Sequence, residues 1–122
     1  MNIALWVITA LLAGAFLAAG VMKVAQPKSA LADKGMGWVE DFSPGQVKAI
    51  GTLEIIGALG VLLLAGIAPA VVPFAALGLG LIMVGAIVTH VRRGEYANVA
   101  VNAALLALAA VVVWGRLGPY AF

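Results

Sequence analysis

The sequence predicts an all-α integral membrane protein, folded as an antiparallel four-helix bundle. Of its 122 residues, 65% are hydrophobic and 10% are charged, and the mean hydropathy is +1.16. Soluble domains average roughly 45–50% apolar and about 25% charged residues, so this chain has too little polar surface to cover its core in water. Four apolar stretches, each near the ~20 residues that cross ~30 Å of hydrocarbon, fill almost its whole length. We therefore expect residues 1–122 to form a single transmembrane domain.

The predicted spans cover residues 3–24, 46–66, 70–91 and 99–115. The first stretch could also be read as a cleaved signal peptide. However, the residues at its start, MNIALW, include no Lys or Arg, which a signal peptide usually carries there. The second and third spans are joined by so few residues that they must form an antiparallel hairpin.

The basic residues predict the orientation of the bundle. All but one of the seven Lys and Arg residues border or occupy the first and third connections, and the exception is Arg116. The six are Lys23, Lys28, Lys34, Lys48, Arg92 and Arg93. The positive-inside rule makes these two connections cytoplasmic and leaves both termini outside. We expect the membrane to be a bacterial plasma (inner) membrane, and the net charge of +2 requires no nucleic-acid partner.

The first connection is long and contains its own structural signals. Residues 29–34 could form one helical turn on the membrane surface. Ser43 and Pro44 are typical of a helix start, with Ser43 as the N-cap and Pro44 at the first helical position. Trp38 and Phe42 have two interpretations, as aromatic anchors at the membrane interface or as part of a lid over a site.

Polar residues of all four spans are predicted to lie at one depth. Glu54 interrupts an apolar run about 12 Å from the start of the second span, where an unpaired carboxylate costs about 2.5–3.5 kcal/mol. Lys23 ends the first span and His90 ends the third. Asn98 and Asn102 begin the fourth span on one helical face. These five residues are therefore the candidate ligand-binding residues.

The face of the helix around Glu54 consists mostly of small residues, including Gly51, Gly57 and Ala58. Such faces allow helices to approach closely in lipid, so Glu54 should point into the bundle. We expect it to share a hydrogen bond with Lys23, because each charge is costlier alone than paired. The alternative is that Glu54 only fixes the helix register. His90 could likewise reach the membrane interface instead of serving a site.

Several kinds of chemistry are excluded or disfavoured. The chain has no cysteine, so it has no disulfide, dithiol relay or thiolate metal site. Its one histidine cannot build a bis-His haem or a His-rich metal centre, and no metal site is expected. No nucleotide-binding or catalytic motif is present, and whether the chain is an enzyme stays open.

The stretches AGVMK at 19–23 and GTLEIIGALGVLLL at 51–64 carry a family resemblance. Together with a third span that ends in a polar residue, they resemble the DoxX-like family of small four-helix membrane proteins. Lys23 and Glu54 are the two positions that match the family pattern. The resemblance implies an accessory role in a membrane redox or stress system, or in the assembly of other membrane proteins.

Three function classes follow. The first is binding of a lipid- or quinone-like molecule at the polar site around Glu54, with that molecule as the only cofactor expected. The second is a structural or assembly role, in which small-residue faces pack against other membrane proteins or further copies of the chain. The third, a transport or proton path, would require oligomers, because four helices leave little lumen. A cavity that ends at Glu54 would favour the first class, and a filled core the second.

Overall fold

The computed structural model describes residues 2–33, 36–63 and 65–120. This part of the chain is helical, without strands, and four of its helices are long and apolar enough to cross a membrane. They are α1 (Asn2–Ala25), α3 (Pro44–Leu63), α4 (Val72–Arg93) and α5 (Tyr96–Leu117). The predicted all-α membrane bundle is thereby confirmed.

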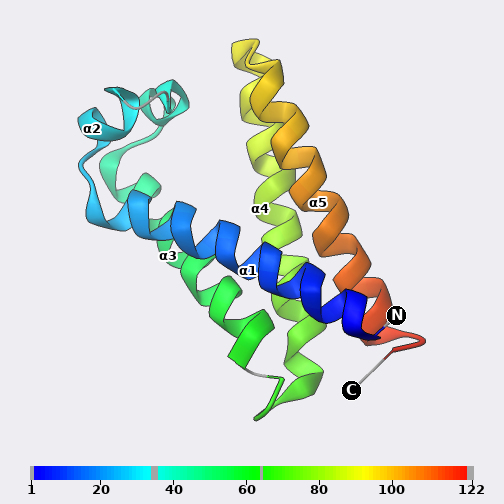
Figure 1. The fold of residues 1–122 in the computed structure, drawn as a ribbon. Coiled ribbons are helices and arrows are strands. Elements are labelled where there is room, and N and C mark those ends of the chain that lie inside the picture. Colours follow the sequence, from blue (N-terminus) through cyan, green and yellow to red (C-terminus); the bar gives the residue numbers. More distant parts are fainter. Residues whose placement is uncertain (1, 34–35, 64, 121–122) are drawn as a thin grey trace.

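The four long helices form two closely packed pairs, α1 with α3 and α4 with α5 (Figure 1). Successive helices run in opposite directions, so both termini lie at the same end of the bundle. The closest approach within the first pair is at Gly20 and Gly51. A Cβ atom on Gly20 would lie 2.6 Å from the backbone oxygen of Gly51, so only glycine permits this contact.

The end of the bundle near the termini has a filled apolar core. Its buried members come from all four long helices and include Leu12, Phe16, Val61, Leu79 and Val112. Helix α3 is followed by a short connection with a 3₁₀ turn, η2 (Pro69–Val71), which leads into α4 as the predicted hairpin requires.

Helix α4 ends in a Schellman turn that sets the start of α5. Gly94 has a positive φ of 71°, its N–H donates to Val91 O, and the Glu95 N–H donates to His90 O. The turn is so tight that α5 begins at Tyr96, three residues before the predicted start of that span.

The first connection folds into two short helices, α2 (Lys28–Asp33) and η1 (Gly37–Asp41), beside the start of α3. Leu31 and Val39 are fully buried there against Val47 of α3, which fixes the connection to the bundle. The predicted helical turn at 29–34 corresponds to α2, although Lys34 lies outside the described residues.

The predicted start of α3 is confirmed. The Gln46 N–H donates to Ser43 Oγ at 3.1 Å, and the Ser43 N–H donates to Gln46 Oε1 at 2.8 Å. This reciprocal pair is a capping box, and it places Pro44 at the first helical position.

Candidate functional site

A cavity of about 660 Å³ lies between the two helix pairs, in the half of the bundle that carries α2 and η1. Its size is within the roughly 300–1,000 Å³ of small-molecule sites. The walls are mostly apolar, with Phe16, Ile82 and Met83 on the side of the filled core. Met36, Trp38 and Phe42 reach it from the first connection.

All five candidate residues from the sequence line this one cavity. Lys23 lies on α1, Glu54 on α3, His90 on α4, and Asn98 and Asn102 on α5. The helical rise and the direction of each span were sufficient to place them at a common depth.

Lys23 and Glu54 form a buried ion pair across the contact between α1 and α3. Lys23 Nζ donates to Glu54 Oε1 at 2.6 Å, and the two side chains are only 9% and 2% exposed. The predicted hydrogen bond is confirmed. Each charge compensates the other, so the pair contributes no net charge to the cavity wall.

The His90 side chain is buried, only 6% exposed, in the last turn of α4. Its Nδ1 lies 2.8 Å from Glu95 Oε1, and its ring meets that of Trp38 edge-on, with centroids 6.3 Å apart. Glu95 was not among the residues predicted from the sequence. Its hydrogen bond with His90 holds the pKa of the Glu95 carboxyl below its usual value.

Asn98 and Asn102 lie one turn apart on α5 and are half-buried at the cavity wall. Within the described ranges, neither side-chain amide has a hydrogen-bond partner. Each amide therefore offers both a donor and an acceptor to a molecule in the cavity.

Trp38 and Phe42 of the first connection cover the cavity at the end away from the termini. Their rings pack edge-on with centroids 5.7 Å apart, and Lys23 Nζ lies 5.6 Å from the centroid of the Trp38 ring. At the same end, Arg93 Nη1 donates to Asp41 Oδ1 at 3.1 Å. Both aromatic residues line the cavity, as the lid interpretation requires, and the choice between a lid and interfacial anchors stays a prediction.

A model of the DoxX-like family matches residues 7–112. The chain belongs to the DoxX-like family. Comparisons with curated proteins and with solved structures gave no significant match. The region that matches the DoxX-like family contains all five candidate residues and the connection that covers the cavity.

The cavity of this DoxX-like protein suits an uncharged polar group. Its ionisable residues are matched, since Lys23 pairs with Glu54 and His90 with Glu95. The described residues of this family member include no group of three His, Cys, Asp or Glu side chains that could hold a metal ion. The two asparagine amides offer uncharged hydrogen-bonding groups there, beside flat rings and apolar walls.

Proposed function

We propose that the chain binds an amphiphile in this cavity, with an apolar tail and an uncharged, hydrogen-bonding head of the kind found in lipids and quinones. The observation that carries the proposal is the convergence of polar side chains from all four long helices on one apolar-walled cavity beside Glu54. Convergent polar groups in an apolar pocket are typical of a ligand site, and intramembrane ionisable residues usually mark function.

Each side chain has a distinct part in the proposed binding. The amides of Asn98 and Asn102 hydrogen-bond a carbonyl or hydroxyl group of the head. The Lys23–Glu54 pair keeps its opposite charges together and presents their remaining hydrogen-bonding capacity to the same head. The ring of Trp38, already edge-on to His90, supplies a flat apolar surface.

In the cell, we place the chain in a bacterial plasma membrane, with the cavity in the cytoplasmic half. The concentration of basic residues in the first and third connections supports this orientation. Membership of the DoxX-like family supports an accessory role in a membrane redox or stress system. The cavity beside Glu54 favours ligand binding over a purely structural partnership, which a filled core would serve better.

Thermal unfolding of the purified protein with two probes, decyl-benzoquinone and dioleoylglycerol, tests the proposal. We expect at least one probe to raise the melting temperature, and Asn102→Leu or Glu54→Ala to abolish the rise. Ala103→Leu is the matched control, because Ala103 is exposed on α5 and does not line the cavity. If neither probe stabilises the unmodified chain, or if both still stabilise Asn102→Leu, the site does not bind such amphiphiles.

A further inference from the structure

Helices α1 and α5 are in contact near the termini. Near the termini, Leu5 packs against Gly115, and Arg116 Nη1 donates to Asn2 Oδ1 at 2.5 Å. From there the two helices diverge toward the end of the bundle where the cavity lies (Figure 1). The gap between them widens beside the cavity.

Residues that line the cavity and are also exposed on the outside of the bundle mark its opening. Ala15 of α1 and Val101 of α5, which is 60% exposed, meet both conditions on opposite sides of this gap. Asn98 and Asn102 lie on the same helix as Val101, within one turn of it. The opening is therefore flanked by the two amides that have no hydrogen-bond partner among the described residues.

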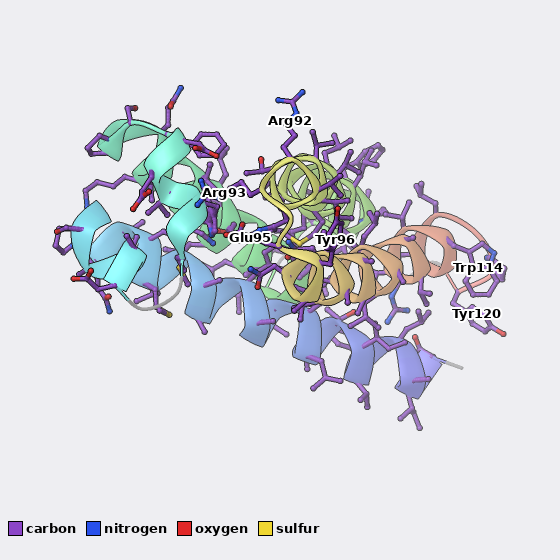
Figure 2. The ribbon with its side chains drawn as sticks, turned by 90° about the horizontal axis from the view of Figure 1, so that it is seen from above. Arg92, Arg93, Glu95, Tyr96, Trp114 and Tyr120 are labelled. Carbon is purple, nitrogen blue, oxygen red and sulfur yellow. The ribbon has the colours of Figure 1, made fainter. Side chains whose placement is uncertain are left out.

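At the end facing water, by contrast, the first connection covers the cavity. Leu31 and Val39 anchor that connection on α3, and the Arg93–Asp41 contact fastens it to the end of α4. Figure 2, which views this end from above, shows Arg93 directed toward η1 and Arg92 directed away from the bundle. A solute from the cytoplasm would have to displace these contacts.

We propose that the ligand enters sideways from the bilayer, between α1 and α5, and keeps its tail there while its head bonds Asn98 and Asn102. This inference rests on the proposed function. It restricts the ligand to molecules already dissolved in the membrane, with an uncharged head and a long tail, and it excludes water-soluble solutes that have no tail.

The opposite side of the cavity, between α3 and α4, is the competing route. There Gly85 is exposed and lines the cavity, and a Cβ atom on it would meet nothing within 4 Å. However, α3 and α4 pack together more extensively than α1 and α5, with Leu79 pressed against Gly57. We therefore assign the route to the α1–α5 side and use Gly85 in the test.

The fluorescence of Trp38 can report binding in the cavity. Only three tryptophans are present, and the other two, Trp6 and Trp114, lie near the termini, so Trp6→Phe with Trp114→Phe leaves a single reporter in the cavity. In this background, in phosphatidylcholine vesicles, decyl-benzoquinone should quench Trp38 emission. Dioleoylglycerol should restore the emission if the site also takes lipid heads. Absence of quenching by the quinone, together with no effect of the glyceride on Trp38, would overturn the proposed function itself.

The route is tested by the rate of quenching after rapid mixing. We expect Ala15→Phe, which narrows the opening, to slow quenching about tenfold or more, equivalent to at least ~1.4 kcal/mol of added barrier. The control Ala18→Phe, at an exposed position on α1 that does not line the cavity, should leave the rate within about twofold. Gly85→Phe, at a cavity-lining position on the competing side, tests the other route and should slow quenching less than Ala15→Phe does. Unchanged rates in Ala15→Phe, or slowing in Gly85→Phe alone, would overturn the route and leave the binding site standing.

The position of the tail is tested by its length. If the tail stays in the bilayer, benzoquinones with butyl and decyl tails should have equal affinities when concentration is expressed per lipid. Affinity that rises with tail length on that scale would mean that the cavity encloses the tail, and would overturn the proposed geometry.

Discussion

Lys23 of α1 and Glu54 of α3 form a buried ion pair, Nζ to Oε1 at 2.6 Å, next to the contact between Gly20 and Gly51. Because the two backbones approach closely there, the side chains of Lys23 and Glu54 meet inside the bundle. The ion pair and the glycine contact therefore lie side by side, and substitutions can test each of them separately.

Breaking the ion pair should cost more than replacing it. We expect Lys23→Met or Glu54→Leu alone to lower stability by about 3–5 kcal/mol, because each leaves an uncompensated buried charge. The double variant should be closer to the unmodified protein than either single one, since two apolar residues leave no such charge. Glu54→Gln should be milder than Glu54→Leu, because the amide still accepts a hydrogen bond from Lys23. Denaturant unfolding of the four variants measures this, and additive losses in the double variant would contradict the pairing.

The glycine contact should tolerate no side chain. In Gly51→Ala the new Cβ would lie 2.7 Å from Lys23 Cβ and 2.8 Å from Gly20 O, so a backbone must move. We expect a loss of about 1–3 kcal/mol, as for other overpacked sites. The matched control is Gly14→Ala, whose Cβ meets nothing within 4 Å and which should gain up to about 1 kcal/mol from helix propensity. Equal thermal stability of the two variants would show that the α1–α3 contact is looser than described.

The sequence was sufficient to predict the fold class and the group of polar residues around the cavity. Lipid as solvent requires long apolar helices, and the rise per residue then gives the depth of each polar side chain. Glu54 and Asn102 could be placed at one level for this reason, although they are far apart in the chain. The size and shape of the cavity that both residues line depend on how the helices cross, which the sequence pattern does not encode.

The contacts that depend on turns could not be predicted. The apolar run of the fourth span starts at Val99, so Glu95 was assigned to a connection. The Schellman turn at Gly94 reverses the chain within two residues, so that the Glu95 carboxylate lies within hydrogen-bond distance of the His90 ring. The Arg93–Asp41 contact could not be predicted either, because it depends on where η1 lies. Burial of Leu31 and Val39 holds η1 in place. The first connection is too short for apolar periodicity to show which of its faces is buried.

The Glu95 carboxylate should make stability depend on pH in the acid range. Its hydrogen bond with His90, and then its ion pair with Arg93, whose Nε lies 3.3 Å from Glu95 Oε2, hold its pKa below the ordinary value of 4.5. A group whose pKa is lowered in the folded state contributes stability above the unfolded value and loses it as pH falls through the folded value. We expect the melting temperature to fall below about pH 4.5, and Glu95→Gln to remove part of that fall.

The matched control for this titration is Asp33→Asn, which removes an exposed carboxylate on α2. Its melting curve should keep the acid slope of the unmodified protein. If Glu95→Gln and Asp33→Asn show the same slope as the unmodified chain, the link between Glu95 and His90 contributes nothing to stability.

The orientation of the bundle can be tested without removing any native thiol, because the chain has no cysteine. Asp33 on α2 and Gly118 after α5 are both exposed, and Figure 1 shows α2 and the C-terminal end of α5 at opposite ends of the molecule. The basic residues of the first and third connections favour placing α2 in the cytoplasm. We therefore expect a membrane-impermeant maleimide to label Gly118→Cys in intact spheroplasts, and Asp33→Cys only after lysis. The reverse pattern would invert the bundle and move the cavity to the outer half of the membrane.

The proposed route would hold in either orientation, because binding from the bilayer needs only a hydrocarbon-facing opening between α1 and α5. Only the leaflet that supplies the ligand would change.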